Sequence, residues 1–382
     1  MEKNFTILTF TVHYLPGYKG GGPIKTIKNL IDQTSDYISY NLITGDRDLG
    51  DNLPYANIDY NSWNKVGCAN VLYAQMGFTR YKEITKVLLE KKYDIVYLNS
   101  FFSPTFSLFP LLIAKSLCQK IVLGPRGEFS EGALSLKTSK KNIFIKLYKI
   151  FGLHRGVIYQ ASSEHEANDI RRVLGHQVDI QIAEDIGAQE FVEALPIRNV
   201  DTLHSVFLSR ISPIKNLLMA IEILKTVKQP ISYHIYGPIE DREYWSECVK
   251  VIDNLPSNIC VEYKGELLPE EVIETIAKYD LFLMPTKGEN YGHVIAEALC
   301  AGLPILIADT TPWRDLEAKG IGWDLPLDDL SAFKHVIEQL ALQSPNERYR
   351  MRKKVLKWAR DKFSQRNAID ANIAMFQYVI NK

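Results

Sequence analysis

Short apolar runs alternate with longer amphipathic segments along almost the whole chain. The runs are rich in branched and aromatic residues, whereas the segments between them have the three-to-four-residue apolar spacing of helices. Continuous apolar strands are typical of parallel sheets covered by helices on both faces, so the pattern predicts a doubly wound α/β architecture. The expected strands are 6–12, 38–43, 94–98, 120–123, 156–160 and 180–183 in the first half, and 205–209, 232–236, 259–263, 281–284 and 305–308 in the second.

The alternation breaks once, at residues 184–203, where acidic residues, a glycine and a proline follow one another without a clear period. We interpret this stretch as the connection between two α/β domains, a number that a length of 382 residues also favours. The expected domains are 1–190 and 191–360. Beyond them, residues 361–382 continue a charged helical pattern that has only a weak break near Ser364.

Charge and cysteine content exclude several classes of protein. Lys plus Arg and Asp plus Glu both number 45, so no net positive field is available to bind nucleic acid. The five cysteines form no Cys-x-x-Cys pair, which is typical of a reducing cytoplasm rather than of a disulfide framework or a structural zinc site. The N-terminus lacks a signal-peptide pattern and no apolar stretch is long enough to span a membrane, so we expect a cytoplasmic protein.

The segment LFLMPTKGENYGHVIAEALCAGLPILI carries the strongest functional signal. It predicts a buried strand at 281–284, a loop, a helix from about His293 and then a second strand. Ligands of open α/β sheets bind where a parallel strand ends and the next helix begins. The backbone amides of Asn290, Tyr291 and Gly292 are therefore expected to face an anionic or hydroxyl-rich ligand, helped by the helix dipole.

Two glutamates, Glu289 and Glu297, lie in this loop and in the helix after it. Their carboxylates can accept hydrogen bonds from the paired hydroxyls of a sugar and a ribose. On spacing alone, the plainer interpretation is that Glu289 caps a turn and Glu297 is a solvated helix residue. Apolar and small residues surround Glu297, however, and an ionised group there needs a partner, which favours a binding role.

A pair of cations follows the expected strand at 205–209. Arg210 and Lys215, in FLSRISPIKNL, suit the two phosphates of a nucleoside diphosphate, because Arg offers a planar fork and Lys a point charge. An ordinary surface Arg and Lys are the alternative. Gly237, in IYGP, ends the next strand and permits close ligand approach, although turn glycines are commoner. The strand end at 260–264 gives only a weak signal for a nucleobase.

Taken together, FLSRISPIKNL, IYGP and PTKGENYGHVIAEALCAGLPIL resemble the retaining glycosyltransferases of family 4, which have the GT-B fold of two Rossmann-like domains facing a central cleft. The family's Glu-x7-Glu pattern falls on Glu289 and Glu297. The resemblance implies that Glu289 contacts the donor sugar, Glu297 the ribose, and Arg210 and Lys215 the diphosphate. It also implies an acceptor-binding first domain, a donor-binding second domain and a last helix that crosses back to the first domain.

The first half resembles the family less closely. Gly20, Gly21 and Gly22 lie between the first strand and a helix that begins near Pro23, and three glycines permit close backbone approach to a phosphate or sugar. A flexible turn is the alternative. In the family the corresponding loop reaches the donor, so Gly21 and Gly22 are expected donor-binding residues. His13, just before the loop, is more ordinary as a packing or hydrogen-bonding residue.

Candidates for the acceptor side lie at two other strand ends. In GPRGEFSEGAL, Arg126 is suited to the acceptor or to a donor phosphate, whereas Glu128 either joins it there or simply pairs with it. Many members of the family have a histidine where this chain has Asn99, so its role is either unassigned or taken by Asn99 or Ser100.

Residues 137–155 contain six Lys or Arg and no acid, interleaved with large apolar side chains. A basic amphipathic element of this kind suits an anionic membrane surface. A helix whose apolar side joins the core explains the same composition, and both can hold at once. Family members that extend lipid-linked glycans commonly dock in this way, which implies a peripheral position on the inner face of the cytoplasmic membrane.

The resemblance thus implies transfer of a hexosyl unit from a UDP- or GDP-linked sugar to a hydroxyl of a lipid-linked glycan, with retention of configuration. Similar PRGE segments occur in members that build bacterial surface polysaccharides, such as O-antigen or capsule. Glu289, Arg210 and Lys215 are the expected catalytic residues, and neither a metal nor another cofactor is expected. A nucleotide-sugar epimerase of the same fold and a non-catalytic scaffold that binds nucleotide sugar or membrane are the alternatives.

Overall fold

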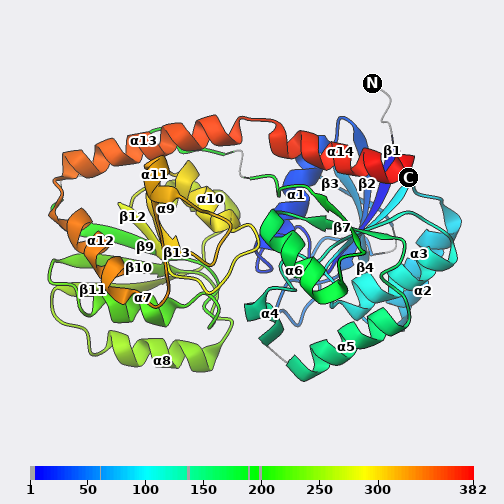
Figure 1. Ribbon diagram of the computed structural model, residues 1–382, viewed down its shortest axis with the longest axis horizontal. Helices are drawn as coiled ribbons and strands as arrows, with labels where there is room; N and C mark the ends of the chain where they lie inside the picture. The colour runs from blue at the N-terminus through cyan, green and yellow to red at the C-terminus, as the bar shows by residue number, and fades with distance from the viewer. Residues whose placement is uncertain (1–4, 61, 136–137, 188–189, 198–199) are drawn as a thin grey trace. The chain divides into compact units, whose positions relative to one another are not determined.

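The computed structural model describes residues 5–60, 62–135, 138–187, 190–197 and 200–382. The chain divides into two compact units, each with its own sheet and its own core (Figure 1). Unit 1 comprises Met1–Ile186 together with Arg366–Lys382, and unit 2 comprises Gly187–Gln365.

Unit 1 is built on one sheet covered by helices. Its strands are β1 Phe5–Thr11, β2 Ile38–Gly45, β3 Asn64–Val66, β4 Ala69–Ala74, β5 Ile95–Asn99, β6 Ile121–Gly124, β7 Val157–Ala161 and β8 Asp179–Ile182. Its helices are α1 Gly22–Thr34, α2 Phe78–Glu90, the π-helical turn η1 Pro104–Leu108, α3 Phe109–Ser116, α4 Glu131–Ser135, α5 Thr138–Ile150, α6 Glu164–Leu174 and α14 Asn367–Asn381.

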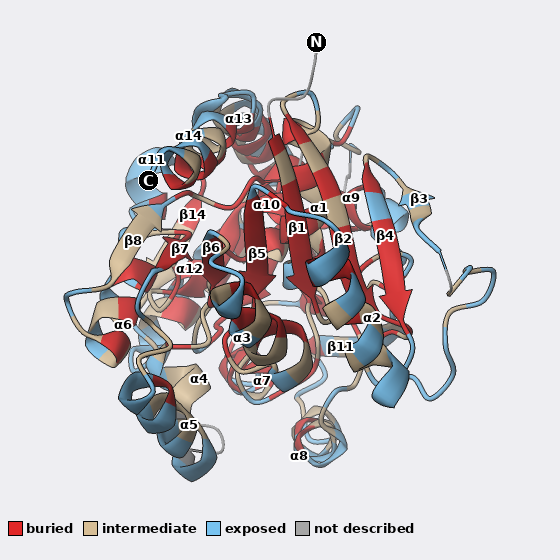
Figure 2. Cartoon of the chain, turned by 90° about the vertical axis from the view of Figure 1, so that its right-hand side faces the viewer, coloured by how far each residue is buried: buried red, intermediate tan, exposed pale blue. Residues whose placement is uncertain are grey.

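The sheet of unit 1 has the order β3-β4-β2-β1-β5-β6-β7-β8. Neighbouring strands are parallel except β3 and β4, which pair antiparallel at one edge. Strands such as β4 and β5 are buried almost throughout, whereas α5 keeps an exposed outer side (Figure 2). This distribution explains why the strands read as continuous apolar runs and the helices as amphipathic ones.

Unit 2 is a smaller α/β unit with an entirely parallel sheet. Its strands, β9 Leu203–Leu208, β10 Ile231–Tyr236, β11 Ile259–Gly265, β12 Leu281–Met284, β13 Ile305–Ala308 and β14 Gly322–Leu325, have the order β11-β10-β9-β12-β13-β14. Its helices are α7 Leu217–Leu224, α8 Arg242–Ile252, the 3₁₀ turn η2 Pro269–Glu271, α9 Val272–Ile276, α10 His293–Cys300, α11 Leu316–Lys319, α12 Leu330–Leu342 and α13 Pro345–Phe363.

The predicted alternation of strands and helices is confirmed, and the structure adds three strands that the sequence pattern did not reveal. β3 and β4 follow a long aperiodic stretch, in which the short apolar run of β4 was not recognised as a strand. β14 contains a glycine and an aspartate, which interrupt its apolar pattern. The weak break expected near Ser364 in the C-terminal helical pattern separates two helices, α13 and α14, which end and begin on either side of residues 364–366.

Candidate functional site

In each unit the strand order reverses at one point, between β1 and β5 in unit 1 and between β9 and β12 in unit 2. Open α/β sheets bind ligands beyond the carboxyl ends of the strands at such a point. In unit 2, the loop after β9 carries Arg210 and Lys215, and the loop after β12 carries Glu289. The structure therefore places these three predicted residues at the edge of the sheet where a ligand is expected.

An ion pair joins the two loops of unit 2. The Lys215 Nζ lies 2.5 Å from the Glu289 Oε1, and their side chains are only 12% and 10% exposed. The pair is thus largely shielded from water, and the attraction between its charges is therefore stronger than that of a pair at the surface. Asn290, next to Glu289, is half-buried.

Backbone contacts fix the same two loops against each other. The carbonyl oxygen of Ile214 accepts hydrogen bonds from the Lys287 N–H, at 2.8 Å, and from the Thr286 hydroxyl, at 3.1 Å. The Asn216 side-chain amide donates to the Pro285 carbonyl at 3.0 Å. These contacts hold Lys215 and Glu289 together without any ligand, so the site is organised in advance.

Arg210 lies nearer to solvent than Lys215. Its Nη1 is 2.6 Å from the Glu240 Oε1, and the two side chains are 31% and 39% exposed. Exposed pairs of this kind contribute little to stability, so Arg210 can exchange its partner for a phosphate at small cost. The structure thus places both predicted cations of unit 2 after β9, one in a buried pair and one in an exposed pair.

Contacts within unit 2 explain why residue 237 is a glycine. Its φ is 130°, and a Cβ there would overlap the carbonyl oxygen of Ser209 at the end of β9. Its N–H donates to the Gly265 carbonyl at 2.9 Å, and its carbonyl accepts from the Tyr263 hydroxyl at 2.9 Å. Glycine is therefore required for the close approach of neighbouring strand ends, and both backbone groups are already bonded within unit 2.

Contacts at the start of α10 hold the loop that carries Glu289. Gly292 precedes the helix with a φ of 81°, a left-handed conformation that favours glycine. Tyr291 is buried, and its carbonyl accepts a 2.5 Å hydrogen bond from the Trp313 indole. The ring of His293 packs on Tyr291, which supports a packing role for this histidine. Glu297 is buried in α10 rather than solvated, so its plainer interpretation is wrong.

In unit 1, the loop after β1 lies at the corresponding reversal of strand order. Gly21 has a φ of 67° and ends the loop, and Gly22 begins α1. Apart from the adjoining residues of the chain, no atom of the described residues lies within 4 Å of the position that a Cβ on Gly21 would occupy. A ligand can therefore approach the backbone here. The His13 Nδ1 lies 3.2 Å from the carbonyl oxygen of Arg47, in agreement with a hydrogen-bonding role.

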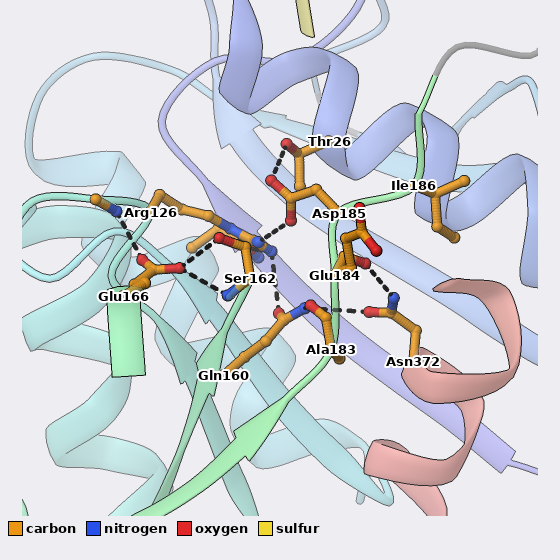
Figure 3. Close-up of polar contacts among 12 residues, drawn as sticks. Thr26, Arg126, Gln160, Ser162, Glu166, Ala183, Glu184, Asp185, Ile186 and Asn372 are labelled. Carbon is orange, nitrogen blue, oxygen red and sulfur yellow. Dashed lines mark hydrogen bonds and ion pairs between the residues drawn. The ribbon is translucent and has the colours of Figure 1, made fainter. Parts of the chain in front are cut away.

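Arg126 lies inside a buried polar network rather than at an open surface (Figure 3). Its guanidinium pairs with Asp185 at 2.7 Å, and it donates to the side chains of Asn99, at 2.7 Å and 3.2 Å, and Gln160, at 3.1 Å, as well as to the Tyr97 hydroxyl. Burial opposes the charge, but the neighbouring Tyr97, Asp185 and Glu166 outweigh it and raise the pKa of Arg126. Asn99, one of the expected acceptor-side residues, is thus bonded to Arg126.

Glu128 does not pair with Arg126, so that alternative is wrong. Its carboxylate accepts hydrogen bonds from the Ser100 hydroxyl at 2.8 Å, from the Phe102 N–H at 3.1 Å and from the Phe101 N–H. Burial raises the pKa of Glu128, and these hydrogen bonds only partly oppose the effect. Glu128 therefore fixes the loop that begins at Ser100, and Ser100 is held in a conformation with a φ of 134°.

Several residues of this region gave no usable signal in the sequence. Asp185 binds both Arg126 and the Thr26 hydroxyl of α1, the latter at 3.0 Å (Figure 3). Gln160 of β7 donates to the Asn372 side chain of α14 at 3.1 Å. Each is a polar residue at the end of an apolar run, where sequence alone does not distinguish a turn from a buried contact.

In the described ranges, no group of three or more His, Cys, Asp or Glu side chains is arranged to hold a metal ion. None of the helices in the same ranges is long and apolar enough to cross a membrane.

The chain is similar in sequence to known proteins. Residues 196–358, within unit 2, match the family model of the Glycosyl transferases group 1. Sulfoquinovosyl transferase SQD2 of Arabidopsis thaliana is 29% identical over 89 residues, which are 23% of this chain and only 17% of that protein. That relative is therefore matched over a small part of its length.

Solved structures match nearly the whole chain. HepE of Anabaena in complex with UDP and glucose has a TM-score of 0.70 at 14% identity, covering 99% of this chain and 100% of that one. Sucrose-phosphate synthase of Thermosynechococcus elongatus has a TM-score of 0.72 at 14% identity, covering 98% of each chain. WaaG, a glycosyltransferase involved in lipopolysaccharide biosynthesis, has a TM-score of 0.67 at 15% identity, covering 96% of this chain and 99% of that one.

At such identities the structural likeness establishes the fold, so the predicted GT-B fold is confirmed. The match over residues 196–358 supports the predicted transferase activity. The chain has the GT-B fold, and its second unit contains a region that matches the Glycosyl transferases group 1 family.

Proposed function

We propose that the protein transfers a hexosyl unit from a UDP- or GDP-linked sugar to a hydroxyl of a lipid-linked glycan, with retention of anomeric configuration. The observation that carries the proposal is the buried Lys215–Glu289 pair, which joins the loops after β9 and β12 where the strand order of unit 2 reverses. A cation and a carboxylate fixed side by side suit a ligand with a phosphate next to a ring of hydroxyls. A nucleotide sugar is such a ligand.

Each donor-binding residue has a definite task in this proposal. Lys215 uses one of its three N–H groups for Glu289, so two remain for the diphosphate. Arg210 exchanges Glu240 for a phosphate, and Glu289 accepts hydrogen bonds from the sugar hydroxyls. Glu297, Asn290, Tyr291 and Gly292 complete the donor site from α10 and the loop before it. Gly21 and Gly22 approach the donor from unit 1.

The chemistry then rests on orientation and electrostatics. The bond between the anomeric carbon and the β-phosphate oxygen breaks, the acceptor oxygen bonds to the same face of that carbon, and the acceptor proton passes to the departing phosphate. Lys215 and Arg210 stabilise the charge that grows on the diphosphate, a kind of contribution worth about 3–4 kcal/mol for one well-placed donor. This scheme requires neither a metal nor another cofactor.

The relatives support the donor and the setting. HepE was solved with UDP and glucose, and WaaG acts in lipopolysaccharide biosynthesis. We infer that this chain also uses a nucleotide sugar and builds a bacterial surface polysaccharide such as O-antigen or capsule. The acceptor binds unit 1, where Asn99, Ser100, Arg126 and Glu128 shape the loops after β5 and β6.

The outer side of α5 supports a membrane-bound acceptor. Ile143, Leu147, Ile150 and Phe151 are 60%, 47%, 65% and 71% exposed, although the opposite side of the same helix packs Tyr148 into the core. Exposed lysines at 140, 146 and 149 accompany these apolar side chains. We infer that α5 rests on an anionic leaflet at the inner face of the cytoplasmic membrane, each cation contributing about 1 kcal/mol. The basic segment starts at residue 137, which lies outside the described residues.

Slow hydrolysis of the donor tests the reaction without knowledge of the acceptor. The protein is incubated with UDP-glucose alone, and proton NMR identifies the anomer of glucose that is released first, before the anomers equilibrate. The proposal predicts α-glucose and free UDP. First release of β-glucose would contradict retention, and conversion of UDP-glucose to an epimer would favour the epimerase.

Vesicle binding tests the membrane surface separately. Changing Lys140, Lys146 and Lys149 to glutamine should reduce sedimentation with vesicles that contain phosphatidylglycerol and leave UDP-glucose hydrolysis unchanged. The matched control changes Lys353, Lys354 and Lys357, three exposed lysines of α13, in the same way. Equal binding by the α5 variant and its control would refute the assignment of this surface.

A further inference from the structure

Two aspartates follow β2 with the spacing Asp-x-Asp, as Asp46-Arg47-Asp48. Two carboxylates at this spacing can chelate a divalent cation. Both residues are nearly inaccessible, at 3% and 4% exposure. The role of each carboxylate is therefore determined by its hydrogen bonds within the protein.

Asp46 holds the segments after β2 and β4 together. Its carboxylate accepts from Arg47 at 3.0 Å and 3.1 Å, from Arg80 at 3.3 Å and from the Met76 N–H at 3.1 Å. Burial alone would raise the pKa of Asp46, but the hydrogen bonds and the two guanidinium charges outweigh it and lower the pKa. Asp46 is thus held as an anion by cations of the protein itself.

Asp48 has a different set of partners, because among the described residues the donors to its carboxylate are all backbone amides. Its Oδ2 accepts from the N–H groups of Tyr18, at 2.7 Å, and Lys19, at 3.0 Å, and its Oδ1 accepts from the Leu49 N–H at 2.8 Å. Tyr18 and Lys19 belong to the loop between β1 and α1, which ends in Gly20 and Gly21 just before α1 begins at Gly22. One buried carboxylate therefore fixes the conformation of that loop from a segment about 30 residues away.

The packing around Asp48 leaves little freedom for the loop. A Cβ on Gly17 would overlap the Tyr55 hydroxyl and come within 2.9 Å of the Asp48 carboxyl carbon. The Gly21 N–H donates to the Tyr18 carbonyl at 2.9 Å, so the anchored residue also sets the position of the glycines. The position of the missing Cβ of Gly21 nevertheless faces open space, as a ligand-binding backbone requires.

We propose that Asp48 is a positioning residue for the reaction, which holds the Gly17–Gly22 loop in the conformation that meets the donor. The inference rests on the proposed function, because that function assigns Gly21 and Gly22 to the donor. Asp48 does not touch the substrate. Its anionic oxygens bind two adjacent loop amides, and hydrogen bonds to a charged acceptor are stronger than neutral ones.

The test compares Asp48→Ala and Asp48→Asn with Asp51→Ala, the control that removes the ion pair of the Lys19 side chain but keeps the backbone hydrogen bonds of the loop to Asp48. Hydrogen exchange of peptides that cover residues 14–24 measures the loop, UDP-glucose hydrolysis measures turnover, and calorimetry measures UDP affinity. Asp48→Ala should exchange faster in this loop and lose at least about tenfold in kcat/KM, because small misplacements near the reacting centre are costly. UDP affinity should stay unchanged, and Asp48→Asn, which keeps one acceptor oxygen, should recover most of the activity.

Unchanged exchange or unchanged kcat/KM in Asp48→Ala would overturn the inference. It would also be overturned if EDTA abolished the wild-type activity, Mn²⁺ restored it, and Asp48→Asn no longer responded to Mn²⁺, because Asp48 would then be a metal ligand. Lys215→Ala separates this inference from the proposed function. If Lys215→Ala impairs turnover and Asp48→Ala does not, only the inference fails, whereas if neither impairs turnover the proposed donor site fails.

Discussion

Replacing Arg126 by alanine tests whether the buried polar network of unit 1 stabilises the fold or serves only to bind substrate. The substitution removes the ion pair with Asp185 and the hydrogen bonds to Asn99, Gln160 and Tyr97. The Asp185 carboxylate remains in a buried site, where the Thr26 hydroxyl still donates to it. One hydroxyl does not replace a guanidinium as the partner of a buried charge.

The magnitude follows from that geometry. Removing one partner of a buried ion pair costs about 3–5 kcal/mol, against a total of about 5–15 kcal/mol for a typical domain. Arg126→Ala should therefore remove a large fraction of the stability of unit 1. Lys86→Ala, which breaks an exposed pair with Glu90 in α2, should cost no more than about 1 kcal/mol and serves as the control.

Hydrogen exchange at increasing urea concentration is the suitable assay, because two units do not unfold as a single two-state system. The opening free energies of peptides from β5, β6 and β7 should fall in Arg126→Ala, while those of unit 2 stay constant. In Arg126→Ala/Asp185→Ala, much of the loss should be recovered, because no buried charge is left without its partner. Equal opening free energies in Arg126→Ala and in the wild type would refute a structural role for this network.

Three further substitutions test other parts of the structure. Gly237→Ala should destabilise unit 2 by about 2 kcal/mol or more, because the new Cβ overlaps the Ser209 carbonyl at a φ of 130°, whereas Gly288→Ala, whose Cβ meets no atom within 4 Å, should leave the urea midpoint nearly unchanged. Burial raises the pKa of Glu166 above its ordinary 4.5, so its ionisation opposes folding at neutral pH. Relative to Glu166→Gln, the wild type should therefore gain stability as the pH falls from 7 toward 4.5, and a constant difference would contradict this. Trp313→Phe removes the hydrogen bond from the indole to the Tyr291 carbonyl, so it should raise the KM for UDP-glucose while lowering the melting temperature only slightly. An unchanged KM would argue against this support of the donor loop.

The fold was largely predictable because its strands and helices obey local periodicities. The runs at 281–284 and 305–308 were located to the residue, since both are buried on both faces. β14 was not predicted because Gly322 and Asp324 interrupt its apolar pattern and because its position depends on pairing with β13.

The candidate site was predictable only where a short motif contained it. Lys215 and Glu289 were assigned separately from their strand ends, and the structure brings them into contact. Of the two alternatives for Glu128, pairing with Arg126 was wrong, because the two side chains reach different partners. Arg126 and Gly127 both have a left-handed backbone, with φ values of 56° and 76°. The contacts of Asp48 and Asp185 join segments far apart in the chain and leave no periodic trace in it.

Donor binding to the Lys215–Glu289 site is the measurement that tests the central claim most directly. Thermal shift is recorded with UDP-, GDP- and ADP-glucose for the wild type, for Lys215→Ala and for Lys225→Ala, an exposed lysine just after α7. A ligand at 100 times its Kd stabilises the native state by about 2.7 kcal/mol. We predict that one nucleotide raises the melting temperature of the wild type and of Lys225→Ala, and that Lys215→Ala loses most of the shift. An equal shift in all three proteins would contradict the assignment of the donor site.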